Sequence, residues 1–195
     1  MSYDLFENIE YQNLENLFNI CKKDSNFIDG VRIEYLKKNQ FFLESLNFLI
    51  DINLINITKN SVSILSKPNI DFSTSLFTNL SKNTEYALSL KSYLSNFINQ
   101  NSSFSFKPNP LYNNLTSNLR NFLISSNKIT YENEEYIISD NKLLDLFKNK
   151  EFSPEQLQNV LENRNKIGLE AEKLVVKYEI EKIKSLNQGL KIDHV

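Results

Sequence analysis

Two carboxylates near the end of the chain have a type and spacing that could serve chemistry. Glu172 and Glu179 are seven residues apart, and positions seven apart differ by only about 20° around a helix of 3.6 residues per turn. On a helix, both side chains would therefore follow one line of the surface. Carboxylates that converge on Mg²⁺ support phosphodiester cleavage, but that site needs several of them, with a lysine or water beside the metal. The alternative is a solvated helix face, on which these glutamates pair with Lys173, Lys177 and Lys182.

Other residue types that carry catalysis are scarce. The single histidine, His194, is the last residue but one, and the single cysteine, Cys21, falls among apolar positions and is expected to be a buried thiol. One histidine and one cysteine far apart argue against a zinc site and against Cys–His catalysis. The chain has three glycines and no phosphate-binding or dinucleotide-binding fingerprint. We expect no metal site and no cofactor in this chain, and these observations weigh against an enzyme.

Composition predicts a globular protein that is not broadly basic. The 195 residues are 41% hydrophobic and 24% charged, with a net charge of −2. This length suits one compact domain or two small ones. A nucleic-acid binder usually carries a basic surplus, so any such surplus must be local here. No stretch approaches the roughly 20 apolar residues that span a bilayer, and the N-terminus lacks the features of a signal peptide. We expect a cytoplasmic protein with no membrane association.

Helices followed by a hairpin characterise the first part of the chain. The apolar residues Phe41, Phe42, Leu46, Leu49 and Ile50 have helical spacing, and two β-rich runs at 54–57 and 62–65 flank a polar turn. This order is typical of a winged-helix unit, here residues 8–68, with 39–51 as its recognition helix. The nucleic-acid-binding candidates combine local positive charge with amides that suit adenine edges, and they are Arg32, Lys37, Lys38, Asn39, Gln40 and Lys59. The expected recognition helix carries little positive charge, so a protein-interaction role remains open.

The second part repeats this order. Helices are expected over 73–100 and 111–126, a short strand over 104–106, and a second hairpin over 128–138. These elements predict a second winged-helix-like unit over 73–150. Its hairpin tip carries Glu132, Glu134 and Glu135, which would repel phosphate. The expected fold class is mostly α with small β-hairpins (α+β), built as tandem winged-helix-like units followed by a long C-terminal helix.

The C-terminal segment, residues 153–195, begins with strong helix-start residues. Ser153 suits the N-cap, Pro154 the first helical position, and Gln156 would complete a capping box. Gly189 is expected to end the helix, and 190–195 to begin a strand. Within this helix one run resembles the opening helix of a bacterial family of restriction-endonuclease-like domains, and its matching residues are Ile167, Gly168, Ala171, Glu172, Val175 and Glu179.

That resemblance implies a setting in restriction or phage defence. The family belongs to the PD-(D/E)XK nuclease class and is usually found at the C-terminal ends of such proteins. Only Glu172 and Glu179 carry over, because the family's metal-binding strands would follow the point where this sequence ends. We therefore expect 153–195 to be a long helix and the start of a truncated nuclease-like domain, with Mg²⁺ implied only if the missing nuclease half is present.

Two functions follow from these expectations. The first is the DNA-binding or assembly portion of a restriction or phage-defence protein, with double-stranded DNA as a partner. The second is a protein-interaction subunit of a multi-component defence complex with no direct nucleic-acid binding. In either case, helix 153–186 is expected to bind a protein partner or a second copy of the chain.

Overall fold

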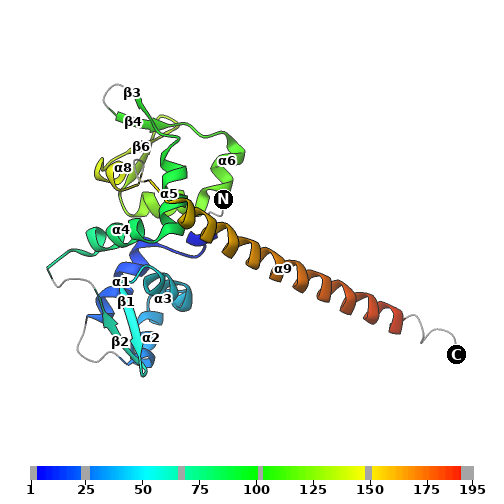
Figure 1. The fold of residues 1–195 in the computed structure, drawn as a ribbon. Coiled ribbons are helices and arrows are strands. Elements are labelled where there is room, and N and C mark those ends of the chain that lie inside the picture. The colour runs from blue at the N-terminus through cyan, green and yellow to red at the C-terminus, as the bar shows by residue number, and fades with distance from the viewer. Residues whose placement is uncertain (1–3, 23–26, 66–68, 101–102, 148–150, 190–195) are drawn as a thin grey trace. The chain divides into compact units, whose positions relative to one another are not determined.

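The computed structural model describes residues 4–22, 27–65, 69–100, 103–147 and 151–189 (Figure 1). It is 61% helical with two small antiparallel sheets, which confirms the expected α+β class. The chain divides into two units, residues 1–151 and 152–195.

The first elements of the 1–151 unit are helices followed by a two-stranded sheet. They are η1 (Asp4–Phe6), α1 (Tyr11–Cys21), α2 (Ile28–Leu36), α3 (Phe42–Asp51), β1 (Ile55–Thr58) and β2 (Ser61–Ile64). The strands pair antiparallel from Ile55–Ile64 to Thr58–Ser61, so the predicted first hairpin is confirmed. Lys59 and Asn60 form its two-residue turn with φ of 47° and 65°, the left-handed conformation that matches the twist of hairpin strands.

The prediction of one helix over 73–100 is wrong in its extent. The chain forms α4 (Phe72–Lys82), α5 (Thr84–Leu94) and then strand β3 (Ile98–Gln100). Asn83 interrupts the helix because its backbone is extended, with φ −79° and ψ 118°. Its side-chain oxygen instead accepts hydrogen bonds from the Glu85 and Tyr86 amides at 3.1 and 3.5 Å. An asparagine that caps a new helix competes with continuation of the old one.

The helix expected over 111–126 is also divided. It consists of α6 (Pro110–Leu115) and α7 (Ser117–Ser125), separated at Thr116. The backbone of Thr116 has φ −100° and ψ 9°, outside the helical range. Its hydroxyl donates to the Tyr112 carbonyl at 2.8 Å. Such local side-chain bonds bend or interrupt helices.

The second half of this unit contains a four-stranded antiparallel sheet. Its strands are β3, β4 (Ser103–Phe106), β5 (Ile129–Glu132) and β6 (Glu135–Ile138), and they lie in the order β3-β4-β6-β5. Helix α8 (Lys142–Phe147) follows β6 in the chain. The predicted strand around 104–106 and the predicted second hairpin are confirmed. Asn133 and Glu134 form the hairpin turn with φ of 50° and 65°.

Both halves of the 1–151 unit share an aromatic cluster. Phe6 is 1% exposed, and its ring centroid lies 5.8 Å from Phe48, 5.6 Å from Tyr86 and 4.9 Å from Phe122. These rings come from η1, α3, α5 and α7, so residues far apart in sequence bury one another. The separation into units 8–68 and 73–150 remains a prediction, since the two segments are joined through this core.

The second unit contains one long helix, α9 (Pro154–Gly189). At its start the Gln156 amide donates to Ser153 Oγ at 3.2 Å, and the Ser153 amide donates to Gln156 Oε1 at 2.9 Å. The predicted capping box is therefore confirmed. The expected strand at 190–195 and His194 lie outside the described residues.

Candidate nucleic-acid and protein interfaces

The exposed side of α3 lacks the charge that phosphate requires. Phe42, Ser45, Leu46, Phe48 and Leu49 are buried. The exposed residues of this helix are Leu43, Glu44, Asn47 and Asp51, and the sequence 42–51 contains no lysine or arginine. The side chain of Leu43 is 64% exposed. The helix that would enter a DNA groove thus presents two carboxylates and an apolar side chain.

The turn before α3 is fixed by a buried tyrosine. The Tyr35 hydroxyl donates to the Gln40 carbonyl at 2.9 Å, and it lies 2.9 Å from Ser45 Oγ. Burial raises the pKa of Tyr35, an effect that the hydrogen bond with Ser45 opposes. The Asn39 amide donates to the Tyr35 carbonyl at 3.0 Å. The half-buried Asn39 side chain therefore stabilises this turn, whereas Gln40 is exposed.

Phe41 departs from the helical position expected for it. It precedes α3 in the left-handed region, with φ 58° and ψ 50°, and it is 40% exposed. For a bulky residue this conformation costs about 1–3 kcal/mol, and such strain gathers at functional sites. On α2, Ile33 and Leu36 are also exposed and are neighbours on the helix surface because they are three residues apart. We name the exposed apolar, acidic and amide residues of α2, of α3 and at Phe41 the α2–α3 face; they are Ile33, Leu36, Phe41, Leu43, Glu44, Asn47 and Asp51, and Arg32, the residue before Ile33, is exposed as well.

The four basic candidates are all exposed and are spread along α2 and the hairpin turn that adjoins its start. Arg32 lies on α2, Lys37 and Lys38 follow its last residue, and Lys59 is in the first hairpin turn. The amide of Ile28 donates to the Asn60 carbonyl at 2.9 Å, so this turn adjoins the start of α2. The helix spans 9 residues, or about 14 Å. Lys59 is therefore separated from Lys37 and Lys38 by roughly the length of α2, with Arg32 on the helix between them.

Local ion pairing further reduces the positive charge. Lys37 Nζ lies 3.3 Å from Glu34 Oε2. In the second half of the unit, Lys107 pairs with Glu134 in the acidic hairpin turn, which lowers the pKa of Glu134 and raises that of Lys107. Arg120 on α7 donates to the Asn113 carbonyl at 2.6 Å. This guanidinium is therefore committed to a contact within the protein.

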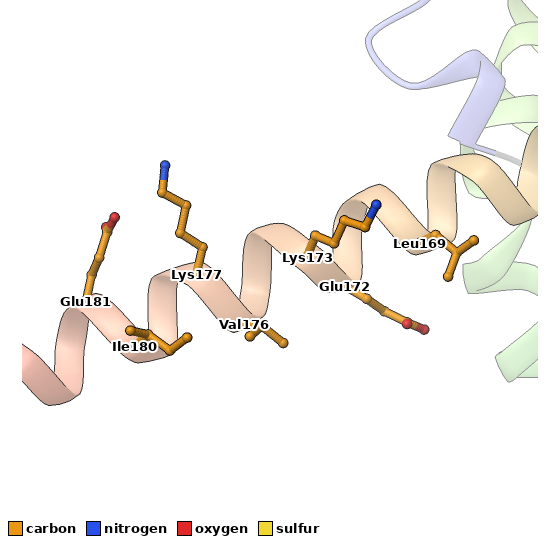
Figure 2. Close-up of a pocket in the computed structure, with 7 residues that line it drawn as sticks. All are labelled: Leu169, Glu172, Lys173, Val176, Lys177, Ile180 and Glu181. Atoms are coloured by element: carbon orange, nitrogen blue, oxygen red, sulfur yellow. The ribbon is translucent and has the colours of Figure 1, made fainter.

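Glu172 and Glu179, the two carboxylates considered for metal chemistry from the sequence, are exposed on α9. Figure 2 shows Glu172 in an open groove along the helix, whose other lining residues are Leu169, Lys173, Val176, Lys177, Ile180 and Glu181. Within the described ranges, no three His, Cys, Asp or Glu side chains come together as a metal site would require. In Figure 2, Glu172 points to the same side of the helix as Leu169 and Val176, whereas Lys173 and Lys177 point to the other side.

Sequence periodicity missed the exposed apolar residues of the α2–α3 face. Phe41 and Leu43 flank Phe42, and a run of three apolar residues does not reveal which one faces the core. Glu44, Asn47 and Asp51 follow one another at intervals of three and four residues. This helical spacing could have indicated that α3 has an acidic exposed side.

Comparison with known proteins identifies no relative of this chain. No family model matches the chain, and neither the curated proteins nor the solved structures yield a match. Along the described ranges, every helix is too short or too polar to cross a membrane. The fold and its exposed side chains are therefore the observations that bear on function.

Proposed function

We propose that the protein is an assembly subunit that binds protein rather than DNA. The observation that carries this proposal is the α2–α3 face, where the expected recognition helix presents Leu43, Glu44, Asn47 and Asp51. Binding to DNA draws most of its non-specific affinity from lysine and arginine contacts to phosphates. A helix with two carboxylates would be repelled, whereas exposed apolar side chains favour a protein surface.

The topology supports winged-helix-like units in this role. In the second half, the element order is α5-β3-β4-α6-α7-β5-β6 and the strand order is β3-β4-β6-β5. The pairing of β4 with the β5–β6 hairpin is what a winged helix would have, and β3 is an additional strand at the edge of the sheet. The first half has three helices and a hairpin. Winged-helix units serve protein assembly as well as DNA binding, because function resides in the exposed side chains and not in the fold.

The resemblance of residues 167–179 to the opening helix of defence nucleases gives the proposal a setting. We place the protein in a multi-component restriction or phage-defence complex, in which any nuclease chemistry belongs to another part of the assembly. In this role Glu172 and Glu179 act in contacts between chains.

DNA binding is the second candidate, and the exposed Arg32, Lys38 and Lys59 favour it. The two candidates differ in fluorescence anisotropy with a labelled DNA duplex. The proposed function predicts no binding at low salt, and no change in the variant Arg32→Ala/Lys38→Ala. Salt-sensitive binding that this variant loses would overturn the proposal in favour of phosphate contacts.

A further inference from the structure

One side of α9 has the residue pattern of a coiled-coil seam. Leu169, Val176 and Ile183 recur at intervals of seven, and Lys173 and Ile180 fall between them at the alternating spacing of four and three residues. This assigns the first three to heptad positions d and the other two to positions a. All five side chains are exposed, and the groove in Figure 2 is lined by four of them.

Charged residues flank this seam in a complementary arrangement. With these heptad positions, Glu172 and Glu179 occupy g and Lys177 occupies e. In a parallel two-stranded coil, a g side chain faces the e side chain of the following heptad in the other helix, five residues further along. Glu172 of one copy therefore meets Lys177 of the other, and symmetry repeats the pair. The sequence gives Glu179 the same spacing from Lys184.

The same charges disfavour other pairings of two α9 helices. In an antiparallel pair, g positions face g positions, so Glu172 would approach Glu179. The opposite side of the helix exposes Leu174 and Tyr178, but a parallel seam centred there would set Lys177 at g against Lys182 at e. Lys173 at an a position adds specificity, because a single polar a residue fixes register and oligomer state at a cost in stability.

We propose that α9 forms a parallel, two-stranded coiled coil with a second copy of this chain, with residues 169–183 as its seam. This inference rests on the assembly role proposed above and names the second copy as its partner. The carboxylates Glu172 and Glu179 then serve as interhelical ion-pair residues. Because the seam is short and has a lysine at one a position, the dimer is weak and dissociates on dilution.

Sedimentation equilibrium of the full chain at several concentrations and low salt tests this proposal. The expected result is a monomer–dimer equilibrium. Val176→Glu, in the seam, weakens dimerisation on the order of a hundredfold because it places two carboxylates in one apolar layer. Leu174→Glu is the matched control, since Leu174 is exposed to a similar extent, 69% against 57%, on the opposite side. Thermal unfolding of the 1–151 unit, unchanged in both variants, shows that each protein is folded.

Reversing the charges of Glu172 and Lys177, one at a time, distinguishes the parallel coiled coil from other modes of association. Glu172→Lys alone and Lys177→Glu alone each set like charges together in a homodimer and weaken it. An equimolar mixture of the two variants restores both pairs and forms a heterodimer. A monomer at every concentration, equal weakening by Val176→Glu and Leu174→Glu, or a mixture that stays monomeric would each overturn the coiled coil. DNA binding by the same preparation, measured by anisotropy, would instead overturn the assembly function, so the two failures are distinguishable.

Discussion

Asn83 joins three helices, and its removal should have a cost that the structure specifies. Its Oδ1 accepts from the Glu85 and Tyr86 amides at the start of α5. Its Nδ2 donates to the Asp51 carbonyl at the end of α3, at 3.1 Å. Loss of an N-cap asparagine costs about 1 kcal/mol, within a range of roughly 0.5–2. Loss of a hydrogen bond to a backbone carbonyl costs about 0.5–1.5 kcal/mol.

The sum predicts that Asn83→Ala lowers the free energy of unfolding by about 2 kcal/mol. For a protein of this size that corresponds to a fall of roughly 4–8 °C in the midpoint of thermal unfolding. The assay is urea unfolding followed by far-ultraviolet circular dichroism and by tyrosine fluorescence, since the chain has no tryptophan.

Asn79→Ala is the matched control that isolates the contribution of the N-cap to stability. The Asn79 amide donates to the Asn53 carbonyl at 3.0 Å, so it makes the same kind of cross-link without capping α5. It should cost only about 0.5–1.5 kcal/mol. Equal effects of the two substitutions, or an Asn83→Ala protein within about 0.5 kcal/mol of the parent, would refute the reasoning, because the cap would then contribute nothing.

Three further predictions concern the rest of the 1–151 unit. Tyr35→Phe should lower the free energy of unfolding by about 1–3 kcal/mol, because it leaves the buried Ser45 hydroxyl without its partner; a neutral result in urea unfolding would contradict the role of this turn. Glu134→Gly should raise the thermal midpoint, because glycine adopts the positive φ of the turn without strain and the exposed ion pair that is lost contributes little; a lower midpoint would count against it. The hydrogen bond from Lys128 at 2.8 Å lowers the pKa of Asp140, so its contribution to stability is present above the unfolded pKa of about 3.9 and is lost as pH falls through the lower folded value. Asp140→Asn should therefore reduce the loss of stability between about pH 5 and pH 3, and an unchanged acid limb of the stability profile would exclude this cause.

Both hairpins could be predicted because their information is local. Alternating apolar residues flank a short polar turn in each, and nearest neighbours in sequence are also neighbours in the sheet. The capping box at Ser153 is local in the same sense. Asn83 and Thr116 show where this reasoning fails, since each interrupts a continuous apolar pattern with a side-chain hydrogen bond. For Asn83 the competing bond also reaches Asp51, which is distant in sequence.

The basic residues near α2 could be named from the sequence, but their arrangement and the exposed apolar residues beside them could not. Arg32, Lys37, Lys38 and Lys59 were expected as nucleic-acid-binding candidates; the structure places them on the surface, and their role stays a prediction. The sequence alone could not show that Lys59 adjoins the start of α2 whereas Lys37 and Lys38 follow its end, because that distance depends on how the hairpin packs. The left-handed backbone of Phe41 was equally hidden, since it results from the tight turn that Tyr35 fixes.

A salt titration of binding to a fluorescein-labelled DNA duplex tests the central claim most directly. The full chain is titrated by fluorescence anisotropy, first at low salt, where phosphate contacts are strongest. We predict no binding even there, because α3 exposes Glu44 and Asp51 and has no lysine or arginine. Micromolar or tighter binding that weakens steeply with added salt would contradict it, and would make the winged-helix-like units a DNA-binding module.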